Sequence, residues 1–106
     1  MTWTMYLILR NPSCLPRIIA EIDAISISTG NTDVAEHLPF LEAVISEALR
    51  LYPPVPLGQY ENVSPDPVVL PDATIIKPGQ IIMYSALVNG RSPALWSDDA
   101  DSFRPE

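Results

Sequence analysis

The chain has 106 residues, 13 of them acidic and six basic, which gives a net charge of −7 and room for one domain at most. Binding to nucleic acid or to an anionic membrane surface depends on clustered lysine and arginine, so we expect this chain to bind neither. Hydrophobic residues make up 47% of it, which favours collapse over disorder. Mean hydropathy is +0.15, unusually apolar for a free-standing acidic domain, and indicates either a rich core or a piece of a larger fold.

The first half of the sequence predicts three helices. Residues 2–10 read as a helical stretch with no cap before it, and Asn11-Pro12 then resembles an N-cap followed by proline at the first helical position. The second helix is expected over residues 12–26, with Arg17 and Glu21 as an ordinary solvated pair. Its apolar stripe consists of Leu15, Ile18, Ile19, Ile22 and Ile25.

A polar loop is expected over residues 26–37, followed by a third helix from about Leu38-Pro39 to Leu51. The apolar face of this third helix is wide, so we expect more than half of its surface to be buried.

The second half cannot be helical for long, because nine of the 12 prolines lie from Pro53 onward. Residues 53–56 are expected to be extended, and residues 68–70, 74–77 and 80–84 read as short strands. A type II turn at residues 77–80 predicts that the last two strands pair as a hairpin. Ser92-Pro93 starts a short helix through Trp96. The expected fold class is α+β, with residues 1–52 helical and residues 53–106 forming a small, mostly antiparallel sheet, turns and coil.

Two residue types with catalytic or metal-binding potential occur only once each. Cys14 excludes an intramolecular disulfide and a cysteine-based zinc cluster, and neither Cys14 nor His37 lies in a recognisable nucleophile motif. The longest early apolar run, residues 5–9, is far shorter than the roughly 20 residues of a membrane-spanning helix, and no signal peptide is predicted.

Glu47 and Arg50 form the most informative pair in the sequence. A spacing of three residues places the carboxylate and the guanidinium on one helix face, within reach of charge-assisted hydrogen bonds. Such pairs are common on solvated helices. Phe40, Val44 and Leu51 lie on the same side, so the sequence leaves open whether the pair is hydrated or buried, and a buried pair fixes geometry more than it adds stability.

The order of several motifs resembles the cytochrome P450 superfamily, the haem-thiolate monooxygenases, over nearly the whole chain. The segments that carry the resemblance are LPFLEA at 38–43, EALRLYPPVP at 47–56, IKPGQ at 76–80 and FRPE at 103–106. Residues 3–12 are similar to the end of the family's long central helix and the start of the next helix. The chain therefore resembles a partial P450 domain, 1–106, an internal segment of the mostly helical P450 fold.

The resemblance implies the following. The family uses haem, dioxygen and two electrons from a reductase to insert oxygen into a small apolar substrate, and the style of residues 49–56 is most similar to fatty-acid or alkane hydroxylases. Glu47 and Arg50 match the E-x-x-R pair that braces the haem-side core. The family is usually held at the endoplasmic-reticulum membrane by an N-terminal anchor, which this sequence does not contain.

The sequence also departs from the family pattern. A third brace arginine would follow Glu106, and Arg104 stands at a variable position, so the brace is expected to be incomplete. The axial cysteine would lie beyond Glu106, and Cys14 is not expected to replace it. No arginine, lysine or histidine lies between Leu51 and Ile76 to hold a haem propionate, which leaves Gln59 and Tyr60 as candidates.

We therefore expect an internal fragment that lacks catalytic residues, binds no metal and holds haem weakly or not at all. Two alternatives stay open. The chain is a non-catalytic interaction module with exposed helix faces that bind a partner, or a small acidic structural domain whose resemblance is accidental.

Overall fold

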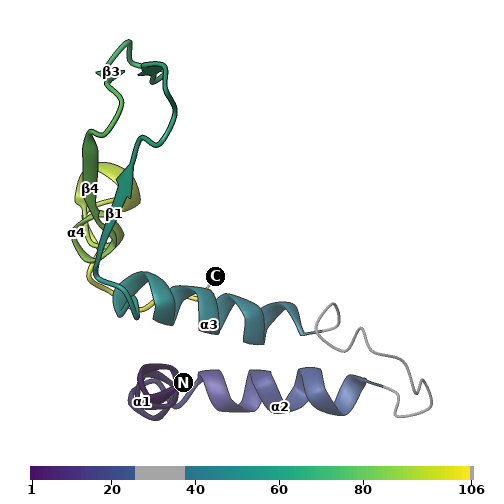
Figure 1. Ribbon diagram of the computed structural model, residues 1–106. Coiled ribbons are helices and arrows are strands. Elements are labelled where there is room, and N and C mark those ends of the chain that lie inside the picture. The colour runs from purple at the N-terminus through teal and green to yellow at the C-terminus, as the bar shows by residue number, and fades with distance from the viewer. Residues whose placement is uncertain (26–37, 106) are drawn as a thin grey trace.

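The computed structural model describes residues 1–25 and 38–105. Helices α1 (Thr2–Arg10), α2 (Cys14–Ala24) and α3 (Pro39–Leu51) pack together, and a ribbon of strands projects away from them (Figure 1). The remaining elements are β1 (Leu57–Glu61), β2 (Val68–Val69), β3 (Ile75–Ile76), β4 (Ile81–Ser85), α4 (Ala86–Gly90) and α5 (Pro93–Trp96). The expected α+β class is confirmed. The loop predicted at 26–37, including His37, lies outside the described residues.

Asn11 forms the corner between α1 and α2, and its predicted role as the N-cap of the second helix is wrong. Its side-chain amide donates to the carbonyl of Leu7 at 2.8 Å, so it closes the C-terminal end of α1 instead. The following helix starts two residues later than predicted, at Cys14, with Ser13 at the N-cap. The Leu7 carbonyl also accepts from the backbone N–H of Asn11 at 3.0 Å, so Asn11 donates to it twice.

The core lies between the three helices. It consists of buried side chains from all three, with Leu41 and Phe103 packed against them: Ile8, Cys14, Ile18, Phe40 and Val44. On α3 the buried positions follow a single stripe, Phe40, Val44, Ala48 and Leu51, while Leu49 is about half exposed. Only four of the 13 residues of α3 are exposed, so the predicted burial of more than half of this helix is confirmed.

The α2 helix buries less than its sequence predicts. Ile18 is buried, but Leu15, Ile19 and Ile22 are each about half exposed. Glu21 has a role that its place in the sequence did not predict. Its carboxylate accepts hydrogen bonds from the backbone N–H groups of Phe40 at 2.7 Å and Leu41 at 3.1 Å, which satisfies two free donors at the start of α3.

The strands form two separate antiparallel pairs, β1 with β4 and β2 with β3. In the first pair Gly58 lies opposite Tyr84 and Tyr60 opposite Ile82; in the second, Val68 lies opposite Ile76. The predicted hairpin between the last two strands is wrong, because β3 and β4 pair with different partners. The strand at 57–61 was not predicted.

The turn at residues 77–80 is nevertheless present. Gly79 has a φ of 72°, which glycine adopts without strain, and the N–H of Gln80 donates to the carbonyl of Lys77 at 3.1 Å. Asn62, the residue after β1, fixes the position of this turn. Its carbonyl accepts a hydrogen bond from the N–H of Gly79 at 2.8 Å, and its own N–H donates to the carbonyl of Gln80 at 3.0 Å. The turn therefore delivers β4 to β1 rather than back along β3.

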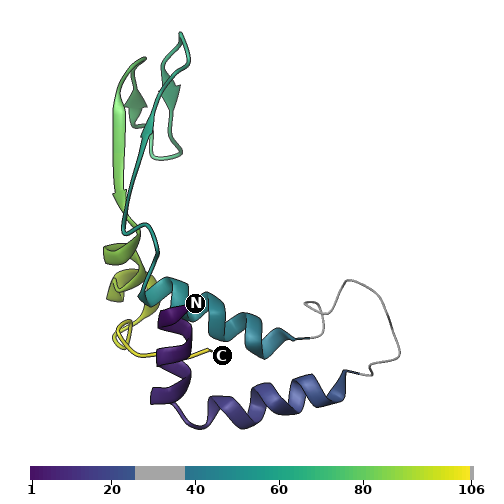
Figure 2. The same cartoon turned by 60° about the horizontal axis from the view of Figure 1, so that its bottom comes forward.

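The chain after β4 returns to the helices. The short helix α5 begins at the predicted Ser92-Pro93, whereas α4 was not predicted; Ser85 caps α4 by accepting from the N–H of Val88 at 3.2 Å. The C-terminal coil then passes beside α3, near α1 (Figure 2). Residues from 90 to 104 thereby come within reach of Glu47 and Arg50.

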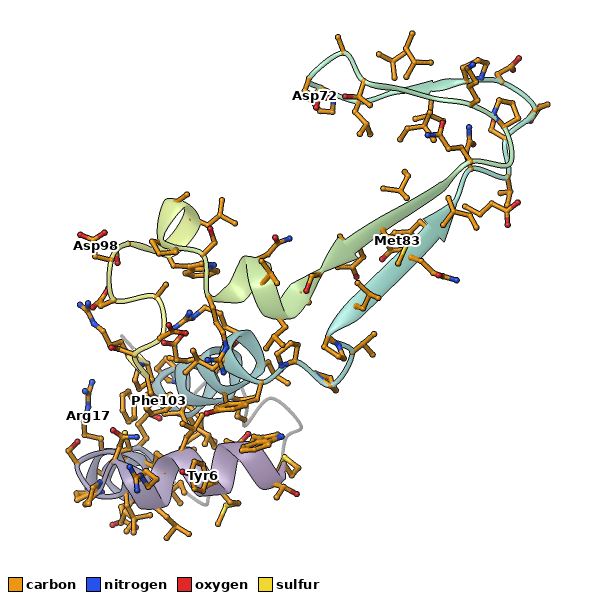
Figure 3. The ribbon with its side chains drawn as sticks, turned by 90° about the vertical axis from the view of Figure 1, so that its left-hand side faces the viewer. Tyr6, Arg17, Asp72, Met83, Asp98 and Phe103 are labelled. Atoms are coloured by element: carbon orange, nitrogen blue, oxygen red, sulfur yellow. The ribbon has the colours of Figure 1, made fainter. Side chains whose placement is uncertain are left out.

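The shape is extended for a chain of this length. The Cα radius of gyration is 19.0 Å, whereas a compact domain of about 100 residues has one of about 13 Å. Many large apolar side chains are exposed on the helices and on both faces of the ribbon, where Figure 3 shows Met83. No helix among the described residues is long and apolar enough to cross a membrane.

Candidate functional site

Glu47 and Arg50 are joined by two parallel hydrogen bonds on one face of α3. Arg50 Nε donates to Glu47 Oε2 at 2.7 Å, and Nη2 donates to Oε1 at 2.6 Å. The two side chains are only 12% and 10% exposed. Fork-to-fork pairing of this kind is short, directional and charge-assisted. We call these two residues the brace.

Arg50 extends the brace to chain segments 40 to 52 residues away. Nη1 donates to the carbonyl of Gly90 at the end of α4, and to that of Ala100 at 2.6 Å. Nη2 also donates to the carbonyl of Ser102 at 3.0 Å. One guanidinium therefore fixes α3, the end of α4 and the C-terminal coil relative to one another.

Glu47 contributes a second link to the same coil. Its Oε1 accepts a hydrogen bond from the backbone N–H of Arg104 at 2.9 Å. Burial raises the pKa of the Glu47 carboxyl. The hydrogen bonds from Arg50 and Arg104, together with their positive charges, lower this pKa by more than burial raises it, so it lies below the usual 4.5. The hydrogen bond to Glu47 likewise raises the pKa of Arg50. The pair is thus held in its charged form.

An aromatic ring and a pocket complete the surroundings of the brace. The Trp96 ring centroid lies 5.0 Å from Arg50 Cζ, a cation–π distance, and Trp96 Nε1 donates to the carbonyl of Asn89 at 3.0 Å. A pocket of about 240 Å³ opens between the brace, Trp96 and Arg104. The side chain of Arg104 itself turns to Asp99.

Cys14 belongs to the helical core. Cys14 is 5% exposed, sits at the start of α2 and packs as a small apolar side chain in the core. It also lines a pocket of about 340 Å³ with Arg17 and Phe103, two residues from different segments that lie near each other in Figure 3. No three His, Cys, Asp or Glu side chains among the described residues come together as metal ligands.

The structure places Gln59 and Tyr60 next to each other on β1, so they project to opposite faces of the ribbon. Tyr60 stacks on Tyr84 of β4, with ring centroids 5.7 Å apart and planes 8° from parallel. A Cβ atom at Gly58 would lie 2.3 Å from the Tyr84 ring, so the glycine leaves room for that ring across the strand. A hydrogen bond with Tyr60, followed by its charge, raises the pKa of Tyr84 above 10.0.

Sequence reasoning missed three contributors to this architecture: Glu21, Arg91 and Tyr84. Glu21 caps α3 from a different helix, and Arg91 donates to the carbonyl of Leu51 at 2.8 Å. The Gly58–Tyr84 contact requires the register of β1 with β4. All three roles depend on contacts between distant segments, so no local pattern in the sequence predicted them.

Comparison with known proteins identifies the family. The sequence pattern of the family "Cytochrome P450" matches residues 1–106. The chain is 39% identical over 106 residues to Cytochrome P450 94A1 of Vicia sativa and 36% identical over 113 residues to Cytochrome P450 CYP94D108 of Paris polyphylla. These matches cover all of this chain but only 20% and 22% of the relatives, so it spans about a fifth of their length. With a family match along its whole length and relatives above 30% identity, the chain belongs to the cytochrome P450 family.

Proposed function

We propose that this chain is the segment of a haem-thiolate monooxygenase that braces the haem-side core through Glu47 and Arg50. The parent reaction inserts one oxygen atom of dioxygen into an apolar substrate, with two electrons supplied by a reductase. The single observation that carries this proposal is the brace itself, in which a buried ion pair joins α3 to backbone groups at positions 90, 100, 102 and 104.

The contacts of the brace support a structural role for the pair. Desolvating two charges is costly, and a buried pair is a weak source of stability, but it disfavours arrangements in which either charge loses its partner. Of the five hydrogen bonds that Arg50 makes, two go to Glu47 and three go to the carbonyls of residues 90, 100 and 102, which restricts how α4 and the coil lie against α3. The brace therefore holds a backbone framework, and the chemistry of oxygen insertion falls to haem and its thiolate, which supplies the electron push for O–O cleavage.

We propose that the chain by itself binds haem weakly or not at all and turns over no substrate. Cys14 is packed in the core at a helix start, a poor environment for an axial ligand. The test is reduction of haem mixed with the chain under carbon monoxide. A stable thiolate-type Soret band that is lost in Cys14→Ala would overturn this part of the proposal.

We propose that the β1–β4 ribbon faces haem or substrate in the parent enzyme, which would act on a fatty acid, an alkane or a similarly apolar molecule. Leu57, Ile81 and Met83 share one face of the ribbon and are each more than half exposed, which supports contact with an apolar molecule. Gln59 lies on this face and Tyr60 on the other, so only one of the two is expected to reach a given haem propionate. By family resemblance the parent protein lies at the endoplasmic-reticulum membrane.

A chimera tests the brace in a complete enzyme. The aligned segment of Cytochrome P450 94A1 of Vicia sativa is replaced by this chain, or by residues 39–105 alone if the longer exchange does not fold. We expect the chimera to incorporate haem, Arg50→Ala to abolish incorporation, and Arg104→Ala to retain it, because the Arg104 side chain pairs with Asp99 outside the brace. Equal haem content in the two variants would contradict the proposal.

The second candidate is a non-catalytic interaction module, which the exposed apolar side chains of α1 and α2 favour. The fragment proposal expects the 106-residue chain to bind the dye ANS through these exposed side chains and to fold with marginal stability. A sharp cooperative melt without dye binding would instead favour an independent domain. Deleting residues 3–10 also distinguishes the two candidates, because an independent domain should keep its fold after that loss.

A further inference from the structure

Arg91, the residue that follows α4, makes a contact that mirrors one made by Arg50. Arg50 donates through Nη1 to the carbonyl of Gly90, and Arg91 donates through Nη2 to the carbonyl of Leu51 at 2.8 Å. Each arginine thus holds the backbone group directly adjacent to the other in sequence. The ends of α3 and α4 are joined by two crossed links.

The two arginines also bind the same short stretch of coil. Arg50 donates hydrogen bonds to the carbonyls of Ala100 and Ser102. Arg91 Nη1 lies 3.1 Å from the carboxylate of Asp101, the residue between them. The Asp101 side chain is 78% exposed, so this ion pair contributes little by itself. The partly buried contact with the Leu51 carbonyl is therefore the more important anchor of Arg91.

Aromatic rings restrict where the Arg91 side chain can lie. Its Cζ is 5.1 Å from the centroid of the Tyr52 ring, and Tyr52 stacks on Trp3 with centroids 4.2 Å apart and planes 5° from parallel. Stacked rings present a flat face on which a guanidinium is favourably placed. The start of α1, the end of α3 and the end of α4 thus meet around Arg91.

We propose that Arg91 is a positioning residue for Arg50. A single contact between two helix ends allows them to pivot, whereas two crossed contacts fix both their separation and their angle. By holding the Leu51 carbonyl, Arg91 keeps the Gly90 carbonyl where Arg50 can use it, and Arg50 does the same in return. This inference rests on the proposed brace and adds a second arginine to it.

The two tryptophans provide separate reporters for the two halves of this arrangement. In Trp3→Phe, Trp96 is the one tryptophan left, with its ring over Arg50, so selectively excited tryptophan emission comes from it. We expect Arg91→Ala to shift Trp96 emission in the same direction as Arg50→Ala, and the double variant to show no further shift. In Trp96→Phe, Trp3 reports on Tyr52, and Arg50→Ala should shift its emission as well.

Matched controls make each outcome decisive. Arg17→Ala also removes an arginine stacked on an aromatic ring, at 3.8 Å from Phe40, and should leave Trp96 emission unchanged. If Arg91→Ala loses its helical signal, Arg91→Lys is used. Lysine keeps the charge but replaces the planar fork of Arg91 with a single nitrogen, so a smaller shift in the same direction is expected. Trp96 emission that is unchanged in Arg91→Lys while Arg91→Ala is unfolded would overturn the proposal.

The failure of this inference is distinguishable from failure of the brace. A shift in Arg50→Ala with none in Arg91→Ala, or shifts that simply add in the double variant, would overturn the role of Arg91 and leave the brace intact. An Arg50→Ala variant with unchanged Trp96 emission would show that Arg50 is not held against Trp96, and would overturn both proposals.

Discussion

Glu47 and Arg104 are 57 positions apart, yet a carboxylate oxygen of Glu47 accepts a hydrogen bond from the backbone N–H of Arg104 at 2.9 Å. The link uses the main chain of Arg104, while its side chain pairs with Asp99. Any residue with a backbone N–H at position 104 could therefore make this contact, and the specificity of the arrangement lies in Glu47 and Arg50.

Removal of Arg50 should be far more damaging than removal of Arg104. Arg50→Ala leaves the Glu47 carboxylate unpaired in a nearly buried position, which typically costs about 3–5 kcal/mol of unfolding free energy. The Arg104–Asp99 pair is exposed, and Arg104→Ala should cost no more than about 1 kcal/mol. Urea unfolding followed by far-UV circular dichroism measures both. Equal, small losses would show that the brace is hydrated in solution.

The brace should make the chain sensitive to acid. Hydrogen bonds from Arg50 and Arg104 outweigh burial and lower the pKa of Glu47 in the folded chain below 4.5, so the unfolded chain binds the proton more tightly. The stability contributed by the Glu47 charge is therefore complete above about pH 4.5 and is lost as pH falls through the folded value. Acid titration of the helical signal should show this loss in the native sequence and a weaker dependence in Glu47→Gln.

The two stacked tyrosines should titrate as an interacting pair. The hydrogen bond with Tyr60 raises the pKa of Tyr84 above 10.0. The stability that this hydrogen bond contributes is therefore present below pH 10 and is lost as pH rises through the raised pKa. Ultraviolet titration of tyrosinate should show one late-ionising tyrosine, which returns toward the ordinary value in Tyr60→Phe.

The glycine opposite Tyr84 offers an independent check on this pair. Gly58→Ala places a methyl group where the Tyr84 ring lies, so the ring must swing away from Tyr60 and its pKa should fall. Tyr6→Phe, on α1, is the control and should leave the late ionisation in place. A late-ionising tyrosine that persists in both Tyr60→Phe and Gly58→Ala would contradict the pairing.

Glu21 should stabilise α3 although it belongs to α2. Glu21→Ala removes the acceptor for the N–H groups of Phe40 and Leu41, and the loss of such a cap costs about 1 kcal/mol. Glu21→Gln keeps one oxygen acceptor, so its stability should lie between those of the native chain and Glu21→Ala. Asp23→Ala, an exposed residue of the same helix, is the matched control for thermal unfolding. A loss in Asp23→Ala as large as in Glu21→Ala would argue against the cap.

The helices of the first half were readable from the sequence because their signals are local. Residues 2–10 and 39–51 carry apolar residues at helical spacing and are bounded by Asn11 and by Pro39 and Pro53, which depends only on neighbours along the chain. The family motifs, the spacing of Glu47 and Arg50, the turn at 77–80 and the short helix at Ser92-Pro93 were accessible for the same reason.

Only the tertiary structure decided which strands pair and what surrounds the brace. A turn with proline and glycine predicted a hairpin of β3 with β4, but Asn62 holds that turn and directs β4 to β1. Burial of Glu47 and Arg50, the role of Glu21 as a cap and the crossed contacts of Arg50 and Arg91 all join residues 19 to 57 positions apart. Such contacts leave no periodic trace in the sequence, because each depends on where a distant backbone group comes to lie.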